Sequence, residues 1–309
     1  MKKLLSTLFL IVTTASCYAQ AYTQTANYTW MSGPNTLNAA SGFGTKGVPS
    51  TTNIPASIYE ATSWGDDIGN LWLFGGNASS SNRFNALFRY NTATNEWTWM
   101  TGGNSYNNLG VYGTKGVAST SNTPGARNSA FKWKDLNGNL WLFGGYGYGT
   151  TTTIGDLNDL WKYDIALGQW TWVSGGNSIS QAGTYGTKGV PNAANKPGSR
   201  RNALSWFKGN SIYLHGGWGL HSTALTGHLN DLWKFDIALG QWTWISGING
   251  RNSASVYGTK GVTAVSNSIG GRSEAASFID HSGSFWIFGG RDFSLGVMNN
   301  TNDLWKLDF

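Results

Sequence analysis

The feature that most constrains this chain is one stretch of sequence that occurs four times. Each copy contains a Gly-Gly pair, and the pairs begin at Gly75, Gly144, Gly216 and Gly289, which are 69, 72 and 73 residues apart. A period of this size indicates one supersecondary unit repeated in an array, in which each unit buries its apolar faces against its neighbours. The fold must therefore be explained as four versions of one unit.

The second copy shows what one unit contains. Residues 140–143 are a run of large apolar residues that ends at Gly144, which is typical of a strand buried on both faces. Residues 130–133, 160–164 and 170–173 alternate between apolar and polar residues, as half-exposed strands do. No helical period is present. Each unit is therefore predicted to hold four short strands.

These residues resemble the kelch repeat, whose pattern is a large apolar run, Gly-Gly, a polar loop, an aromatic residue, six further residues and then Trp. The aromatic and Trp pairs of the first three copies are Tyr90 and Trp97, Tyr163 and Trp170, and Phe235 and Trp242. The resemblance covers the chain from about residue 28 onward. The central domain of galactose oxidase is built from repeats of this kind. The resemblance implies an all-β, kelch-type β-propeller of four four-stranded blades, with the repeated Trp buried between blades. Because kelch propellers serve enzymes, adhesins and scaffolds alike, the resemblance does not choose among functions.

The two ends of the repeat region complement each other. Residues 28–31 match residues 97–100, the last strand of a unit, whereas residues 304–309 match the third strand of a unit. We therefore expect residues 28–31 to pair with residues 304–307 and close the last blade, which leaves no bare sheet edge. The alternative is a truncated piece of a larger array.

The first residues have the pattern of a secretory signal peptide. Lys2 and Lys3 precede the apolar run 8–12, and small residues follow, so residues 1–19 are predicted to be removed and residues 20–309 to form the propeller. Cys17 is the single cysteine and lies in this segment; lipidation of Cys17 is an alternative. The protein is expected to be secreted or on the cell surface, and no other segment is apolar enough to span a membrane.

Composition and charge limit the classes of partner that the protein can be expected to bind. Trp occurs 17 times and Gly 43 times, whereas charged residues make up only 12% of the chain, which fits a loop-rich β domain. The net charge of +6 includes Lys2 and Lys3, so the mature domain carries about +4 without any basic run. This charge does not indicate nucleic acid binding. We expect a monomer without cofactor or bound metal.

The loops between strands differ in length, and the difference predicts a functional surface. The turns between the first and second strands and between the third and fourth strands are short. The loops between the second and third strands and between successive units are long. Because antiparallel strands alternate in direction, both long sets lie on one side, the loop-rich face. Loops on a rigid scaffold usually carry function.

Three arginines are candidate ligand-binding residues on this face. Arg127, Arg200 and Arg272 occupy equivalent positions before the first strand of units two to four. Guanidinium groups at the mouth of a central channel would suit a carboxylate or another anion. The alternative is that each arginine hydrogen-bonds loop carbonyls.

Aromatic residues supply a second set of candidates. Tyr146 and Tyr148 in the second unit and Trp218 in the third lie in the loops between second and third strands. Flat aromatic faces stack on sugar rings and on protein side chains. The predicted ligand-binding residues are thus the three arginines and these three aromatic residues, with packing as the alternative for the aromatics.

Other patterns have weaker functional interpretations. The phrase Gly-Thr-Lys-Gly occurs in every unit, but the spacing of a phosphate-binding loop is absent, so a structural role is favoured. Glu60 and Glu274 occupy equivalent positions and could act as an acid and base pair. His215, His221 and His228 lie in one unit, but their spacing does not ensure convergence on a metal.

The leading prediction is an exported, non-enzymatic module that binds a glycan or a protein through its loop-rich face. The alternatives are a carbohydrate-acting kelch enzyme resembling a sialic-acid isomerase, and a structural repeat of a larger surface protein. A copper oxidase like galactose oxidase is disfavoured because, as the resemblance implies, its chemistry needs a cysteine joined to a tyrosine. Outside the signal segment the chain has no cysteine.

Overall fold

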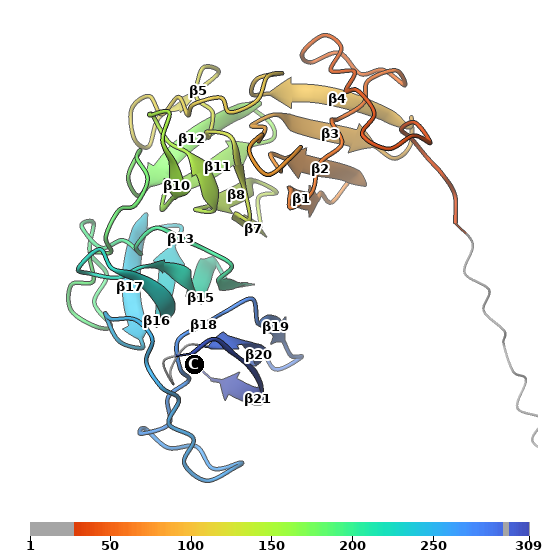
Figure 1. Ribbon diagram of the computed structural model, residues 1–309. Coiled ribbons are helices and arrows are strands. Elements are labelled where there is room, and N and C mark those ends of the chain that lie inside the picture. The colour runs from red at the N-terminus through yellow and green to blue at the C-terminus, as the bar shows by residue number, and fades with distance from the viewer. Residues whose placement is uncertain (1–27, 293–296, 309) are drawn as a thin grey trace, which may run out of the picture. The chain divides into compact units, whose positions relative to one another are not determined.

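The computed structural model describes residues 28–292 and 297–308 (Figure 1). The described residues form five antiparallel sheets and contain no helix, so the all-β class is confirmed. A search of the described residues for a helix that is long and apolar enough to cross a membrane finds none. The predicted signal segment and Cys17 lie outside the described residues.

The described part of the chain forms 21 strands, most of them short. In chain order they are β1 Thr62–Gly65, β2 Asn70–Phe74, β3 Leu87–Asn91, β4 Glu96–Thr101, β5 Ala118–Ser119, β6 Arg127–Asn128, β7 Phe131–Lys134, β8 Leu140–Phe143, β9 Tyr146–Tyr148, β10 Ile154–Asp156, β11 Leu160–Asp164, β12 Gln169–Ser174, β13 Arg200–Arg201, β14 Leu204–Lys208, β15 Ser211–Leu220, β16 Thr226–Asp236, β17 Gln241–Ser246, β18 Arg272–Ser273, β19 Ala276–Ile279, β20 Phe285–Asp292 and β21 Asn299–Leu307.

The main sheets follow the predicted repeat. We number the repeats by residues: repeat 1 is 43–101, repeat 2 is 112–174, repeat 3 is 185–246 and repeat 4 is 257–307. Repeats 1 to 3 each contain four strands paired in order, β1-β2-β3-β4, β7-β8-β11-β12 and β14-β15-β16-β17. In repeat 4 the described residues form three of these strands, and β20 pairs with both β19 and β21. The prediction of four strands is therefore confirmed for repeats 1 to 3.

An aspartate organises the turn between the first two strands. Asp135 Oδ1 accepts hydrogen bonds from the backbone N–H groups of Asn137 and Asn139, both 2.9 Å long. Asp135 Oδ2 accepts a bond from the indole N–H of Trp141 at 2.7 Å. Asp66 makes the same set of bonds in repeat 1. The short turn is thus fixed by one side chain whose bonds replace backbone pairing.

The Gly-Gly pair is required because the next repeat approaches it closely. Gly144 and Gly145 have φ angles of 61° and 91°, a region that favours glycine. A Cβ on Gly144 would lie 2.8 Å from the carbonyl oxygen of Arg200, and the Gly145 N–H donates to that oxygen at 3.0 Å. The pair therefore joins the second strand of one repeat to the start of the next.

The core lies between neighbouring sheets. Each of the three large apolar clusters combines residues of two successive repeats, 1 with 2, 2 with 3 and 3 with 4. Trp170 and Trp242 are each 1% exposed. Their rings contact Phe74 and Phe143 of the preceding repeat at centroid distances of 5.5 and 5.6 Å. The predicted burial of these two tryptophans between units is confirmed, whereas the equivalent Trp97 is half-buried.

The two sets of long loops contact each other, as the alternating strand directions require. The loop that follows repeat 1 donates from Asn107 N–H to the carbonyl of Arg83, which lies between β2 and β3. The loop that follows repeat 2 donates from Ser180 N–H to the carbonyl of Asp156. These contacts place both loop types on one side of each sheet, so the loop-rich face exists within each repeat.

The predicted closure of the last sheet by residues 28–31 stays a prediction. Residues 28–31 form no strand in the structure. Within repeat 4, β21 pairs with β20.

We predict that Trp170→Ala lowers the free energy of unfolding by about 3–5 kcal/mol, because it empties a site packed between two sheets. Trp97→Ala is the matched control. Trp97 has the same place in its sheet, but among the described residues its ring contacts lie within repeat 1. Chemical denaturation of both variants measures the difference. Equal losses would contradict the assignment of the core to the space between sheets.

Candidate functional site

The three arginines expected on the loop-rich face are buried in ion pairs. Arg127 binds both carboxylate oxygens of Asp159, at 2.6 and 2.7 Å. Arg127 also donates to the carbonyls of Gly125 and Gly144, both at 3.0 Å. The Arg127 and Asp159 side chains are fully shielded from solvent. Arg200 with Asp231 and Arg272 with Asp303 repeat this arrangement.

Each carboxylate is also bound by a tyrosine and a tryptophan. Tyr112 donates its hydroxyl to Asp159 at 2.6 Å, and the Trp161 indole N–H donates at 2.8 Å. The equivalent bonds to Asp231 come from Tyr185 and Trp233. Asp303 receives the same two kinds of bond. We call each set of four side chains a polar tetrad.

The ion pair of repeat 3 keeps its charges despite burial. Burial alone would raise the pKa of Asp231, but the Arg200 guanidinium and the hydrogen bonds of the tetrad lower it, and the net direction is downward. Burial likewise opposes the charge of Arg200, yet Asp231 raises the pKa of that arginine overall. The pair of Arg200 and Asp231 is therefore ionised at neutral pH.

This geometry corrects the interpretation of Arg127, Arg200 and Arg272 as ligand-binding residues. Their side chains have no exposed surface. Each makes a bidentate pair with an aspartate of its own repeat, and two of its donors bind glycine carbonyls. Loop carbonyls are among the partners, as the alternative expectation had it, but the aspartates are partners that the sequence pattern did not indicate. The arginines hold the repeats together, and a ligand arriving from solvent cannot reach them.

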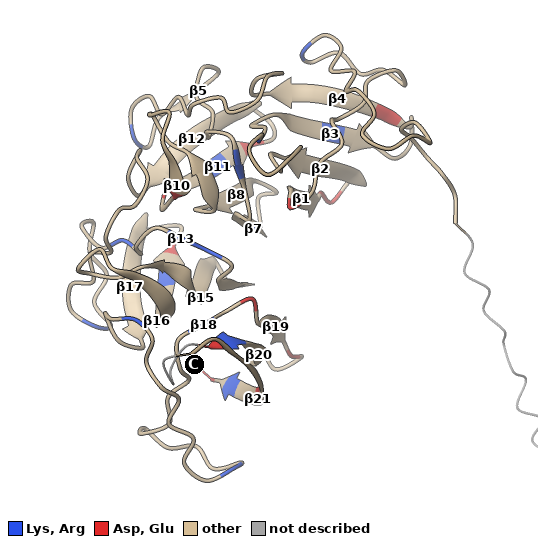
Figure 2. Ribbon diagram, viewed as in Figure 1, with Lys and Arg blue, Asp and Glu red and all other residues tan. Residues whose placement is uncertain are grey.

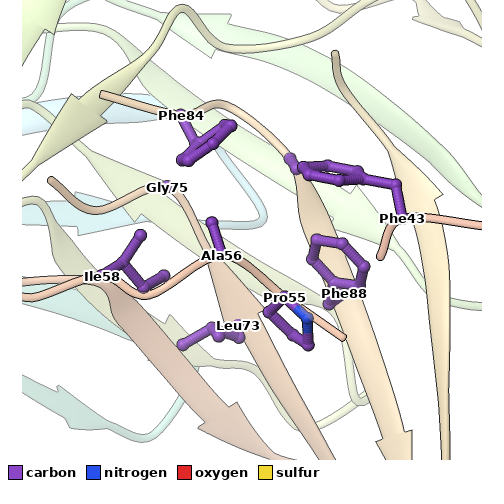
Figure 3. Close-up of a pocket in the computed structure, with 9 residues that line it drawn as sticks. Phe43, Pro55, Ala56, Ile58, Leu73, Gly75, Phe84 and Phe88 are labelled. Carbon is purple, nitrogen blue, oxygen red and sulfur yellow. The ribbon is translucent and has the colours of Figure 1, made fainter. Parts of the chain in front are cut away.

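Repeat 1 replaces all four members of the tetrad by apolar residues. Ile58 stands for the arginine and Ala86 for the aspartate, while Phe43 and Phe88 stand for the tyrosine and the tryptophan. Figure 3 shows Phe43 between Phe84 and Phe88, with ring centroids at 5.7 and 5.1 Å. The cavity that remains has about 10 Å³ and apolar walls, too small for any ligand.

The repeated lysine of the Gly-Thr-Lys-Gly phrase serves the fold. Lys46, Lys115 and Lys188 each donate to a glycine carbonyl just after the fourth strand, at 2.8–2.9 Å. Each ammonium group also lies 4.3–4.5 Å from the centre of a Trp ring of that strand. These contacts explain why the phrase recurs, and they support its structural interpretation.

The candidate site is a cavity of about 530 Å³ at the start of the first strands. The first strands of successive sheets are neighbours, β1 beside β7, β7 beside β14 and β14 beside β19. Just before them, each repeat contributes one polar residue to the cavity. We call it the polar pocket, and its lining is Glu60, Ala61, Ser129, Ala130, Phe131, Asn202, Ala203 and Glu274.

The four polar residues share an unusual backbone conformation. The φ angles of Glu60, Ser129, Asn202 and Glu274 are 55°, 54°, 54° and 57°. Left-handed backbone is uncommon outside glycine and Asn or Asp, and costs about 1–3 kcal/mol for other residues. The fold therefore imposes one kink at four equivalent places. Two of these places carry glutamate, which the left-handed backbone conformation does not favour.

Hydrogen bonds orient the two carboxylates. Glu60 Oε2 accepts bonds from Asn77 and Asn128 amide groups at 3.0 and 2.5 Å, and from the Ser129 hydroxyl at 3.3 Å. Glu274 Oε1 accepts a bond from the Asn202 amide at 3.1 Å. Its other oxygen pairs with Arg291 at 3.1 Å. The pocket thus has fixed acceptors on two sides.

The predicted aromatic residues lie outside the lining of this pocket. The Tyr146 ring is contacted by the guanidinium groups of Arg83 and Arg201, at 5.1 and 4.5 Å from its centre. Tyr148 is half-buried in β9. Trp218 is half-buried in β15, and its ring meets His228 edge-on at 4.9 Å. Their role in binding remains a prediction, and the structure shows packing for Tyr146 and Trp218.

The histidines do not form a metal site among the described residues, where no group of three metal-binding side chains converges. His215 is buried in β15, in the position that is phenylalanine in the other repeats. Burial lowers the pKa of His215 to about 4. His215 is therefore a neutral core residue at pH 7.

Sequence reasoning found part of the polar pocket. Glu60 and Glu274 stood out because Ser129 and Asn202 occupy their positions in the other copies. What it missed was that all four meet in one cavity and that Arg83, unique to repeat 1, supports them by donating to Asn128 at 2.8 Å. The signal available in the sequence was that the four polar residues occupy the same position in each repeat. Figure 2 shows lysine and arginine residues scattered over several strands and loops.

Comparison with known proteins adds little. No protein-family model matches the chain, and no curated protein matches it. The chain is similar to the solved structure of YjhT, with 16% sequence identity and a TM-score of 0.49, over 82% of this chain and 70% of that one. A TM-score of this size is too low to support a statement about fold or function.

We predict that Asp159→Ala alone lowers the free energy of unfolding by about 3–5 kcal/mol, because it leaves Arg127 buried without its partner. The combination Tyr112→Phe, Arg127→Ile, Asp159→Ala and Trp161→Phe copies repeat 1 into repeat 2. It should lose much less stability, because no buried charge remains unpaired. Urea denaturation compares the two. A combination as unstable as the single change would show that the tetrad does not act as a unit.

A second prediction concerns pH. Between pH 6.5 and about 4 the unfolded chain protonates His215 and the folded chain does not, so the stability present at pH 7 is lost as pH falls through this window. We expect His215→Phe, the residue of the other repeats, to remove about 2–3 kcal/mol of the loss between pH 7 and pH 4.5. Parallel pH profiles for the parent and the variant would contradict this assignment.

Proposed function

We propose that the chain is an exported kelch-type β-propeller whose four repeats are its blades, and that it acts as a glycan-binding module. The four antiparallel units, packed sheet on sheet and joined through their Gly-Gly pairs, support the architecture. The signal-peptide pattern of residues 1–19 supports export to the cell surface or beyond. The ligand enters at the polar pocket on the loop-rich face.

One observation carries the function. Four equivalent positions have the same left-handed backbone but different polar side chains, and all four line one cavity. A scaffold requirement explains the backbone but not the choice of Glu, Ser, Asn and Glu. Local rules are most often broken at functional sites, where side chains are chosen for what they bind.

The chemistry of the pocket fits a hydroxyl-rich ligand. The carboxylates of Glu60 and Glu274 accept hydrogen bonds, the Ser129 hydroxyl can donate or accept, and the Asn202 amide has both kinds of group. The remaining lining consists of three alanine methyl groups and the small exposed edge of Phe131, which is 7% exposed, so it offers a small apolar surface to a sugar ring. A cavity of about 530 Å³ lies in the range of small-molecule sites.

Acidic sugars fit this pocket poorly. The repeated arginines that would attract an anion are buried with aspartates. The two carboxylates of the lining would repel a ligand carboxylate. A glycan without negative charge is therefore favoured over the sialic-acid chemistry that the kelch resemblance implied as an alternative.

We predict that Ser129→Gly combined with Asn202→Gly weakens binding of a neutral sugar about 10- to 30-fold, as the loss of two hydrogen bonds requires. Glycine accepts the left-handed backbone, so the melting temperature should not fall. Ser180→Gly is the matched control, because Ser180 has a φ angle of 56° and lies outside the pocket lining. Calorimetric titration with glucose, galactose and their disaccharides measures the effect.

The proposal fails if no neutral or amino sugar binds the parent protein. It also fails if the control variant loses as much affinity as the double variant, because the pocket would then have no special role. Binding of a protein from the same source, without any sugar binding, would favour a protein-binding module instead.

A further inference from the structure

The two carboxylates of the polar pocket differ in how their charge is balanced. Glu274 is paired with Arg291, whose Nε lies 3.1 Å from Oε2. Glu60 accepts hydrogen bonds from two amide groups and a hydroxyl, all of them neutral. Within residues 28–292 and 297–308, Glu60 forms no ion pair. One negative charge of the pocket is therefore left for a ligand.

The bonds to Glu60 also leave one oxygen available. All three donors bind Oε2, and no described residue donates to Oε1. The donors fix the orientation of the carboxylate, so a ligand bound at Oε1 needs little further ordering of the protein. An exposed carboxylate held by neutral donors, with one oxygen free, is suited to a cationic donor.

We propose that the polar pocket selects a sugar with a free, protonated amino group, and that Glu60 Oε1 binds the ammonium. The inference rests on the proposed function and names its ligand class. An ammonium group brings three N–H donors and a positive charge to a pocket rich in acceptors. The neighbouring Ser129 and Asn202 then serve the hydroxyl groups. An N-acetylated sugar lacks the charge and offers one N–H, so it binds more weakly.

The test compares glucosamine, glucose and N-acetylglucosamine by calorimetric titration of the full chain at pH 6 and low salt. We expect glucosamine to bind at least about tenfold more tightly than the other two, as one charged hydrogen bond warrants. The preference should weaken strongly near pH 9, where an amino group beside electron-withdrawing oxygens, with a pKa of about 8 like that of an α-amino group, has lost most of its proton. Equal affinities for glucosamine and glucose at pH 6 overturn the inference.

The variant Glu60→Gln keeps the size of the side chain and removes its charge. We expect it to reduce the preference for glucosamine over glucose to less than about twofold. The control Glu96→Gln changes the net charge by the same amount. Glu96 is the first residue of β4 and lies outside the pocket lining, so this variant should keep the full preference. If Glu60→Gln retains the preference, Glu60 does not hold the amine. If glucose binds but glucosamine has no advantage, this inference alone fails; if no sugar binds, the proposed function fails with it.

Discussion

The buried pair of arginine and aspartate is the contact on which the repeated structure depends. In repeat 2 the Arg127 guanidinium reaches the third strand through Asp159 and the second strand through the carbonyl of Gly144. The arginine backbone meets the preceding repeat, because its carbonyl accepts a bond from Gly76 at 2.9 Å. One residue thus joins two strands of its own repeat to the repeat before it. A buried charge can do this because all of its partners are in place.

Repeat 1 shows that the same space can be filled without charge. Its four apolar replacements occur together, which is expected if an unpaired member would leave a buried polar group unsatisfied. The sequence contained this signal: the copy that lacks the arginine also lacks the aspartate, as Ile58 and Ala86 show. When the arginine and the aspartate are replaced together in one repeat, the joint replacement indicates that the two side chains touch. It is a stronger signal than the polar character of either residue, which alone would indicate exposure. That joint change could have placed the arginines in the core.

The strands were predictable because apolar runs, alternation and turn residues are local features. The start of the first strands was less predictable, because only the packing of β1, β7, β14 and β19 side by side brings residues about 70 positions apart into one cavity. The sequence placed Glu60 and Glu274 at one register position but gave no distance between them. The predicted closure likewise rests on matching patterns in residues 28–31 and β21, and such patterns say nothing about whether the segments meet.

The polar pocket separates what the fold requires from what it leaves open. Each repeat needs a left-handed residue between the short strand that carries the arginine and the first strand, and the φ angles there agree within 3°. The tetrads do not use the side chains at positions 60 and 274, which instead bond neighbouring repeats through Asn128 and Asn202. Glycine or asparagine would relieve the backbone at both positions, yet both carry glutamate. Those carboxylates supply the acceptors on which the proposed sugar binding rests.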